Sequence, residues 1–281
     1  MTPIADPGKL ERMLVNEADM AARRRVRVVL EYLDIREGDR VLDCGCGLDW
    51  FLKVIGELTA CSLSGTDFDV PRLDTARREM GPRAPVAASD ILHLPYADAT
   101  FDKIVLSEVL EHVPDDASAL AEVARVVKPG GLIAITVPNH DYPVLWDPVN
   151  WTRERLGWEP IREGFFGGLW TDHQRLYTRD SIAELVSRSG LVVEDSRQFV
   201  HHCFPFAHNL VYGLGMRLVQ SGLLSEADRF RYDVNTGNRC APLNLARGFF
   251  RWIDSWNDPV SDEGKTAVIL SVKARKARAP R

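Results

Sequence analysis

The sequence predicts an α/β protein built on a doubly wound, mostly parallel sheet. The first observation is alternation: short apolar runs such as Lys103-Ile104-Val105-Leu106-Ser107 are separated by segments rich in helix formers. The second is that these runs are apolar throughout, as expected for strands buried on both faces. The third is a glycine-rich turn directly after the first run, where an open α/β sheet places its ligands.

Length and composition limit the alternatives. A chain of 281 residues with 45% hydrophobic and 27% charged residues suits one enlarged soluble domain. The formal net charge of −5 gives no basic field for nucleic acid, so no nucleic-acid partner is expected. The five cysteines form no Cys-x-x-Cys pair, and the N-terminus shows no basic and apolar leader. These features favour a reducing, cytoplasmic location.

Residues 1–38 are predicted to form an N-terminal helical cap. Apolar residues recur there at helical spacing, and Gly38 interrupts the pattern before the first strand. The recurring positions are Leu10, Met13, Leu14, Val26, Val29, Leu30 and Leu33.

The stretch from Asp39 to Asp69 predicts a βαβ unit that binds a nucleoside. Val41-Leu42 ends a buried strand, Gly45 and Gly47 mark a tight turn, and a helix begins near Phe51. About 20 residues past the turn, Asp67 follows a second strand, where a carboxylate can accept hydrogen bonds from both ribose hydroxyls.

The position that a dinucleotide fold fills with a third small residue holds Trp50. This bulky side chain argues against a diphosphate clamp, and therefore against an NAD-dependent oxidoreductase.

The rest of the core, residues 39–139, continues the alternation. A helix ends at Met80, short strands are expected at 86–88 and 103–107, a helix spans 117–127, and 132–138 is the next strand. The residues Lys128-Pro129-Gly130-Gly131 are predicted to be a turn.

The run Val41-Leu42-Asp43-Cys44-Gly45-Cys46-Gly47 resembles the first motif of class I S-adenosylmethionine-dependent methyltransferases. Three later segments, at 94–102, 110–113 and 127–132, are similar to later motifs of that family in the same order. Asp49 departs from the pattern, which usually has glycine there. The resemblance implies a Rossmann-like sheet of seven strands, with an antiparallel last strand beside the fifth, and S-adenosyl-L-methionine as cofactor.

The resemblance also implies roles for individual residues. Asp43, with the turn Gly45-Cys46-Gly47, holds the amino-acid end of the cofactor, and Asp67 holds the ribose. Phe68 packs along the adenine, which Asp90 and Ile91 meet, while Ser107 and Glu108 line the methionyl side. The alternative role for Asp43 is a structural one, in which its carboxylate caps a helix.

Residues 140–177 are predicted to be a lid on the substrate side, without regular structure. Their many aromatic residues argue against disorder, and the segment follows the strand end where ligands bind. Trp146 and Trp170 are its candidate substrate residues. A helix and strand at 178–202 continue the core and end at His201 and His202, which are candidates for pocket or packing residues.

Residues 203–260 are predicted to be a helical insertion, in which Phe204 is a further candidate substrate residue. His208, Asn209, Arg217 and Gln220 interrupt its apolar stretch, so no transmembrane helix is expected. Packing on the domain, a wall for a lipophilic substrate and an interfacial membrane helix all fit. Residues 261–281 are predicted to hold the last strand, Thr266–Val272, and a solvated basic tail from Lys273 onward.

His173 is the preferred catalytic base, with Asp172 beside it in sequence and His112 as a further catalytic candidate. The alternative for His173 is a hydrogen-bonded loop anchor, and for His112 a structural or cofactor-side role. No set of histidines and acids shows metal-ligand spacing, so no metal is predicted.

The function expected from these observations is O-methylation of a small lipophilic or aromatic metabolite by in-line methyl transfer. N- or C-methylation of a small molecule remains open, as does a catalytically silent module that binds the nucleoside. The sequence leaves the oligomeric state open.

Overall fold

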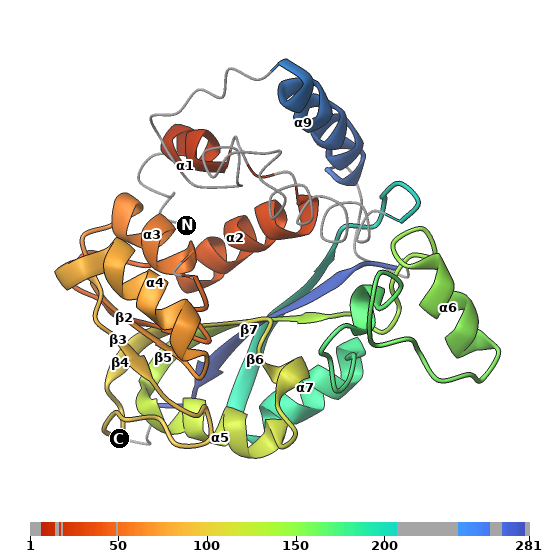
Figure 1. The fold of residues 1–281 in the computed structure, drawn as a ribbon. Helices are drawn as coiled ribbons and strands as arrows, with labels where there is room; N and C mark the ends of the chain where they lie inside the picture. The colour runs from red at the N-terminus through yellow and green to blue at the C-terminus, as the bar shows by residue number, and fades with distance from the viewer. Residues whose placement is uncertain are drawn as a thin grey trace.

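A computed structural model describes residues 7–14, 17, 19–48, 50–206, 241–258 and 266–278. One seven-stranded sheet crosses the molecule, with helices on both of its faces (Figure 1). The strand order is β3-β2-β1-β4-β5-β7-β6. The predicted doubly wound, Rossmann-like fold is therefore confirmed.

The strands are β1 (Arg40–Cys44), β2 (Ser62–Asp67), β3 (Val86–Ala88), β4 (Phe101–Ser107), β5 (Val127–Pro138), β6 (Leu191–Phe199) and β7 (Ile269–Lys276). The α-helices are α1 (Pro7–Met13), α2 (Met20–Leu33), α3 (Trp50–Leu58), α4 (Val70–Met80), α5 (Asp116–Val126), α6 (Pro148–Arg155), α7 (Arg179–Arg188) and α9 (Ala241–Asp254). Short 3-10 helices are η2 (Gly81–Arg83), η3 (Leu110–His112), η4 (Gly168–Trp170) and η7 (Ser255–Asn257).

The strand order reverses at β1. This strand pairs in parallel with β2 on one side and with β4 on the other, so the two connections leave β1 in opposite directions. Ligands of open α/β sheets bind outside the carboxyl ends of the strands at such a point. The Gly45–Gly47 turn, the end of β2 and the end of β4 all lie there.

The last strand, β7, is antiparallel to both neighbours and fills the position between β5 and β6. Leu270 of β7 pairs with Val137 of β5 and with Gln198 of β6. The antiparallel last strand beside the fifth is thus confirmed.

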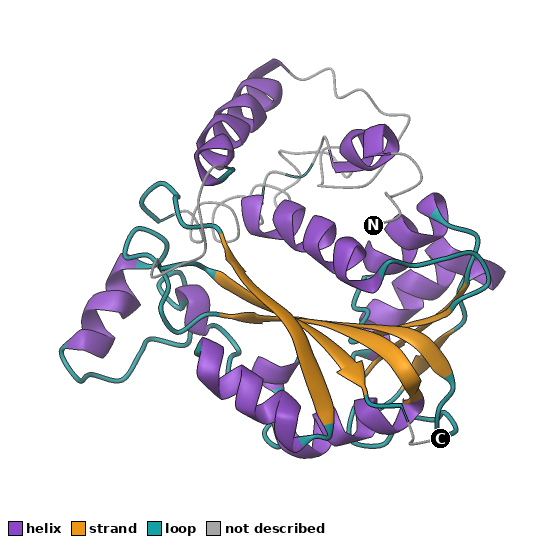
Figure 2. Ribbon diagram, turned by 180° about the vertical axis from the view of Figure 1, so that it is seen from behind, coloured by secondary structure: helices purple, strands orange, loops and turns teal. Residues whose placement is uncertain are grey.

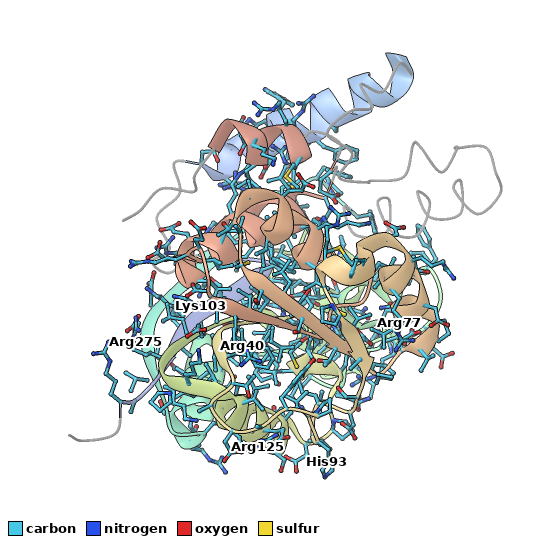
Figure 3. The ribbon with its side chains drawn as sticks, turned by 90° about the vertical axis from the view of Figure 1, so that its left-hand side faces the viewer. Arg40, Arg77, His93, Lys103, Arg125 and Arg275 are labelled. Carbon is cyan, nitrogen blue, oxygen red and sulfur yellow. The ribbon has the colours of Figure 1, made fainter. Side chains whose placement is uncertain are left out.

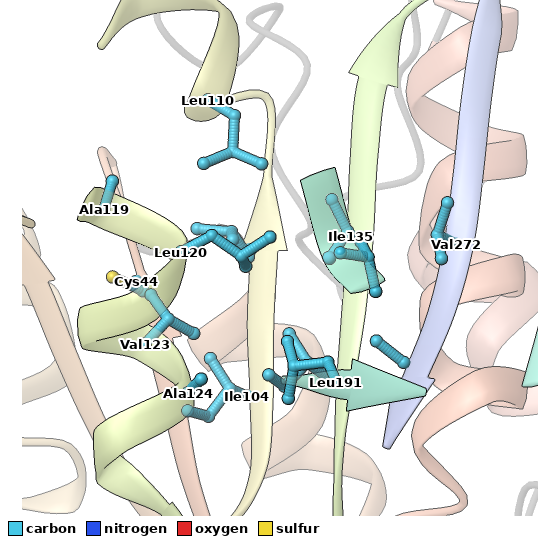
Figure 4. Close-up of a cluster of buried hydrophobic side chains, with 14 of the residues drawn as sticks. Cys44, Ile104, Leu110, Ala119, Leu120, Val123, Ala124, Ile135, Leu191 and Val272 are labelled. Atoms are coloured by element: carbon cyan, nitrogen blue, oxygen red, sulfur yellow. The ribbon is translucent and has the colours of Figure 1, made fainter. Parts of the chain in front are cut away.

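Helices cover both faces of the sheet (Figure 2), and an apolar cluster on each face packs them against it. On one face, side chains of α2 and α3 such as Val29 and Leu52 pack with Val41 and Val105. On the other face α5 and α7 pack over β4, β5 and β7, and Figure 4 shows Leu120 and Val123 of α5 near Ile104. Buried apolar area on both faces explains why the strands read as continuous apolar runs.

The strand β5 begins earlier than predicted. Val127 already pairs with Phe101, and the register shifts before Lys103 meets Leu132. Gly130 takes φ +83°, and a Cβ on Gly131 would lie 2.8 Å from the carbonyl oxygen of Asp102. The predicted turn at 128–131 is therefore an irregular part of a strand.

The expected solvated tail is wrong for its first basic residues. Lys273, Arg275 and Lys276 belong to β7. Lys276 Nζ donates to the carbonyl oxygens of Ala124 (2.6 Å) and Val127 (2.9 Å), where α5 ends, and Arg275 donates to that of Gly130 (2.7 Å). Cations bind helix carboxyl ends because the free carbonyls are negative.

The segment 140–177 is more regular than the predicted lid, since it contains α6 and η4. Asn150 is fully buried, and its Nδ2 donates to Asp147 Oδ2 (3.0 Å) and to the carbonyl oxygens of Ile161 (3.1 Å) and Gly167 (3.0 Å). Its Oδ1 accepts from the amide of Ile161 (2.7 Å). The buried side chains of Asp147 and Asn150 thus tie the start of α6 to residues 161–169 of the lid segment.

Most of the predicted insertion, residues 207–240, lies outside the described residues, as does Asp49. Among the helices that the structure does describe, none has the length and apolar character needed to span a membrane.

Candidate functional site

The turn after β1 bends sharply at its two glycines. Gly45 has φ +82° and Gly47 φ +51°, conformations that residues with a Cβ rarely adopt. The amides of Gly45 and Cys46 donate to the carbonyl oxygen of Thr66 (2.7 and 2.9 Å), which fixes the turn to the end of β2. A Cβ on Gly45 would lie 2.3 Å from Val109 Cγ2, whereas a Cβ on Gly47 would meet nothing within 4 Å. The backbone at Gly47 is therefore open to a ligand.

Asp67 lies at the end of β2, as predicted, and faces this turn. Its Oδ2 accepts from the amide of Gly47 (2.8 Å), and its Oδ1 accepts from the amide of Asp69 (2.9 Å). Each carboxylate oxygen can accept two hydrogen bonds, so both oxygens keep a lone pair for a ribose hydroxyl. Asp69 caps α4 through the amide of Arg72.

The remaining cofactor candidates lie along the same edge. Asp43 is buried at the end of β1, while Phe68 is 81% exposed directly after β2. Asp90 and Ile91 follow β3, and Asp90 Oδ1 accepts from the amide of Leu92 (2.9 Å). An exposed Phe ring beside a carboxylate that can hold ribose suits the stacking of a nucleoside base.

Ser107 is the last residue of β4 and Glu108 follows it. Both belong to one hydrogen-bonded group of polar side chains. Thr136 Oγ1 donates to Glu108 Oε1 (3.0 Å) and lies 2.8 Å from Ser107 Oγ. Arg25 of α2 forms an ion pair with Glu108 Oε2 (3.1 Å), so the N-terminal cap reaches this edge. Glu108 has φ +55°, a strained backbone of the kind found at binding and catalytic sites. Sequence reasoning missed Arg25 and Thr136, which no local pattern connects to residue 108.

The catalytic candidates His112 and His173 come together although they are far apart in the chain. Their ring centroids are 4.7 Å apart. Asp172 contributes its backbone: its carbonyl oxygen accepts from His112 Nδ1 (2.9 Å), and its own φ is +62°. The pairing of the Asp172 carboxylate with His173 stays a prediction.

Sequence reasoning missed Glu111, whose side chain is fully buried beside these rings. Burial, reinforced by the negative charge of Glu108, raises the pKa of Glu111 well above its usual range. Its main chain is also used, because its carbonyl oxygen accepts from the amide of Gln174 (2.7 Å). This bond holds the lid segment against η3.

The substrate candidates do not form one group. Trp146 packs in a third apolar cluster with Tyr142, Leu169 and Phe199. Trp170 is also buried, and the guanidinium of Arg162 lies 4.8 Å from its ring centroid. Trp170 starts the turn that carries His173, since its carbonyl accepts from the amide of His173 (3.3 Å).

His201, His202 and Phe204 lie by the start of β7 and by α9. His201 is buried with its Nδ1 2.8 Å from the carbonyl oxygen of Thr266, and the amides of both histidines donate to Asn257 Oδ1. Phe204 contacts Phe249 and Phe250 of α9. These contacts anchor α9, and a role in substrate binding stays a prediction.

A cavity of about 390 Å³ lies away from this edge, between α2 and α9. Its lining residues include Arg23, Arg24, Arg27 and Arg251 with Asp254 and Asp258. Arg24 and Arg25 point to different neighbours, because Arg24 pairs with Asp254 (2.5 Å) and Arg25 with Glu108. The cavity is therefore separate from the β1–β4 edge, where the predicted cofactor residues gather.

Residues 42–135 match the model of a family described as a methyltransferase domain. In sequence and in strand order, the core of the chain is similar to class I S-adenosylmethionine-dependent methyltransferase domains. The matched range runs from β1 into β5 and contains the glycine turn, Asp67, Glu108 and Glu111. S-adenosyl-L-methionine is the cofactor that this family and fold imply.

Two of the curated relatives are named as methyltransferases. The methyltransferase GfsG of Streptomyces halstedii is 36% identical over 41% of this chain and 43% of its own length. The O-methyltransferase CnsE of Penicillium expansum is 29% identical over 51% of this chain and 52% of its own length. The chain thus spans about half the length of these relatives. Among solved structures, the [4+2]-cyclase SpnF aligns over 91% of this chain and 81% of its own, with TM-score 0.55 and 20% identity, which shows a shared fold.

The side chains at the ends of β1, β2 and β4 fit S-adenosylmethionine on chemical grounds. Asp43, Asp67 and Glu108 place carboxylates at the ends of β1, β2 and β4. Such an edge would repel a diphosphate, whereas it suits ribose hydroxyls and the cationic amino and sulfonium groups of S-adenosylmethionine. Asp67 with the open backbone of Gly47 would hold the nucleoside, and Asp43 with Glu108 the amino-acid end.

Proposed function

We propose that the chain transfers the methyl group of S-adenosylmethionine to a hydroxyl oxygen of a small lipophilic or aromatic molecule. The observation that carries the proposal is the meeting of two groups at one sheet edge. Carboxylates and a bent glycine turn lie at the ends of β1, β2 and β4, and η3, which begins two residues after Glu108, carries His112 against His173 of the lid segment. The first group suits the cofactor, and the second suits an acceptor that must lose a proton.

When bound, S-adenosylmethionine supplies a methyl group activated by its sulfonium. The acceptor oxygen forms the new C–O bond, the C–S electron pair returns to sulfur, and the hydroxyl proton leaves. The chain's own contribution is alignment, which can supply several kcal/mol. His173 lies against His112, which follows Glu108 in η3, so His173 is the proposed proton acceptor for a reaction without a metal ion.

The choice of oxygen as the methylated atom rests on this histidine pair and on the sequence similarity to CnsE, an O-methyltransferase. An amine or an activated carbon needs less help with its proton, so N- and C-methylation remain the alternatives. The preference for a lipophilic or aromatic acceptor rests on the aromatic side chains around the lid and α9, among which Phe166, Phe249 and Trp252 are exposed.

Calorimetry with S-adenosylmethionine, S-adenosylhomocysteine and NAD tests the cofactor. Binding of the first two without NAD is expected, and NAD binding alone would reject the proposal. Turnover is then followed as S-adenosylhomocysteine released with a panel of phenols, alcohols, amines and activated carbon acids. The methylated atom is assigned by NMR of the product, with phenols and alcohols expected to react.

The likeness to SpnF gives a second candidate, in which the same fold binds the nucleoside and promotes a ring closure without transferring methyl. Consumption of acceptor without release of S-adenosylhomocysteine would favour that function.

A further inference from the structure

Three side chains with metal-binding atoms converge beside the proposed methyl-transfer site. Glu111 and His112 come from η3, and His173 comes from the lid segment. One ligand atom of each lies within 4.8 Å of the others. The histidines were predicted as catalytic residues, and Glu111 is the member that the sequence did not single out.

Glu111 shows that the cluster is built for a cation. Its side chain is 0% exposed, and neither carboxylate oxygen has a hydrogen-bond partner among the described residues. A buried carboxylate is normally hydrogen-bonded or paired, because burial removes its water. The imidazole Nε2 of His112 lies 3.9 Å from Glu111 Oε1, and the guanidinium of Arg25, which pairs with Glu108, also attracts the Glu111 carboxylate. A metal ion between Glu111 and His112 would give the Glu111 carboxylate a direct partner.

His112 is oriented as metal-binding histidines are. Its Nδ1–H donates to the carbonyl oxygen of Asp172 (2.9 Å), so the lone pair of the neutral ring is on Nε2, the nitrogen that faces Glu111. A hydrogen bond from the second ring nitrogen to a carbonyl is the usual outer partner of a metal-bound imidazole. The strained φ of Asp172, +62°, is what brings that carbonyl to His112.

We propose that Glu111, His112 and His173 bind a divalent first-row transition-metal ion, such as Mn²⁺, Co²⁺, Fe²⁺ or Zn²⁺. Two imidazoles and one carboxylate favour these ions over Mg²⁺ and Ca²⁺, which prefer oxygen ligands. Three protein ligands leave coordination positions open for water or a substrate oxygen. Glu108 is not part of this cluster, and its two oxygens face Arg25 and Thr136.

The catalytic role of the ion rests on the proposed methyl transfer, although its binding does not. A hydroxyl oxygen on the ion is more acidic than a free one, so it loses its proton to solvent near neutral pH. The resulting oxygen anion then forms the C–O bond, while the C–S pair returns to sulfur. With the ion bound, His173 would be one of its ligands, and solvent would take the hydroxyl proton in place of the His173 base proposed for the metal-free reaction.

Binding is tested on the full chain after treatment with a chelator, by titrating Mn²⁺ and following its EPR spectrum. One bound ion per chain is expected, with spin-echo modulation from histidine nitrogen. Glu111→Gln and His173→Ala should each weaken Mn²⁺ binding at least about tenfold. The control is His93→Ala, an exposed histidine on the loop after β3, which should leave the affinity unchanged.

Folding of each variant is checked by circular dichroism, and 1 mM Mn²⁺ should raise the Tm of the wild type but not of Glu111→Gln. No binding at this concentration by Mn²⁺ or Co²⁺, or equal binding by wild type and both variants, would overturn the metal site. Affinity for S-adenosylhomocysteine, measured by calorimetry without metal, should change less than twofold in both variants. That second measurement fails only if the cofactor site itself is wrongly placed, so the two proposals fail separately.

Discussion

Asp67 shows how one side chain can support both the fold and the ligand. Its carboxylate accepts the amides of Gly47 and Asp69, which fixes the glycine turn relative to β2. The same oxygens keep lone pairs on the side where the Gly47 backbone is open. Asp67→Asn keeps the shape and one acceptor oxygen, but its NH₂ cannot accept the second backbone amide, so this change affects both roles.

Asp67→Asn is expected to weaken binding of S-adenosylhomocysteine by about 1–3 kcal/mol, because charge-assisted hydrogen bonds to ribose are lost. Calorimetry measures the change. Asp74→Asn is the control, since this side chain on α4 is 53% exposed and pairs only locally with Arg77. Equal affinity in wild type and Asp67→Asn would reject the ribose assignment.

Cys44 offers a test of how dry the strand ends are. Burial raises the pKa of the Cys44 thiol to about 12, and that of the less buried Cys61 to about 11. Because only the thiolate reacts, alkylation of Cys44 should rise about tenfold per pH unit from pH 8 to 10 without a plateau. Peptide mass spectrometry after iodoacetamide should show Cys61 modified first. Fast labelling of Cys44 at pH 8 would contradict the packing of β1.

At the scale of single residues, the sequence predicted the roles that depend on local chemistry. Gly45, Gly47 and Asp67 follow from turn geometry and spacing, and the structure places all three at the same strand ends. Arg25 and Glu111 did not follow, because their roles arise from burial and from contacts between distant segments. The structure brings together the predicted His112 and His173, while Trp146 lies in an apolar cluster.

At the scale of elements, the lid segment depends on Asp147. Its carboxylate caps α6 through the amide of Asn150 and accepts the amide of Leu169 (3.0 Å) at η4. Gly168 passes so close that a Cβ there would lie 1.9 Å from Asp147 Oδ2, and its φ is +52°. Gly164 has a similar φ of +71° but open space around it.

Gly168→Ala should therefore cost more stability than Gly164→Ala. Both variants incur the strain of a left-handed backbone, about 1–2 kcal/mol, and only the first must also move Asp147. Thermal unfolding of the two variants measures the difference. If the Tm falls by the same amount in both variants, the contact between Gly168 and Asp147 does not organise the lid segment.

A second clamp fixes the loop before β4 to α5. Arg125 donates to the carbonyl oxygens of Tyr96 (2.8 Å) and Leu94 (3.1 Å) and pairs with Glu122 and Asp98 (Figure 3). These partners hold the predicted Leu94–Asp102 motif in place. The family motif is thus structural here.

Element boundaries were harder to predict than element types. Lys128-Pro129-Gly130-Gly131 has turn composition, yet pairing of Val127 with Phe101 extends β5 through it. Lys273, Arg275 and Lys276 read as a solvated tail because their partners, the end of α5 and Glu194, are distant in sequence. Long-range partners override local propensity in both places.

At the scale of the whole molecule, β7 joins the packing on both faces of the sheet. Leu270 is fully buried in the cluster that joins α5, α7 and the sheet, and Tyr32 of α2 reaches Ser271 from the other face (3.2 Å). The overall α/β order could be predicted from alternation alone. The position of the last strand beside the fifth came from the family resemblance, and its pairing with β6 was not predicted, because no local pattern specifies a strand's neighbours.

Leu270→Ala is expected to lower the free energy of unfolding by about 2–5 kcal/mol, from lost transfer energy and the cavity left behind. Val192→Ala on the neighbouring β6 is the control: its side chain is 53% exposed, so its loss should cost under about 1 kcal/mol. Urea unfolding followed by circular dichroism measures both. Similar losses would mean that β7 is not part of the main cooperative unit.

The late position of β7 in the chain has a consequence for synthesis. On the ribosome, β5 and β6 emerge well before Ile269–Lys276, so each presents an open hydrogen-bonding edge until that strand arrives. Pairings between segments so distant in sequence also form slowly. The nascent protein therefore passes through a stage in which two strand edges have unpaired backbone groups. During that stage a chaperone would protect it from aggregation.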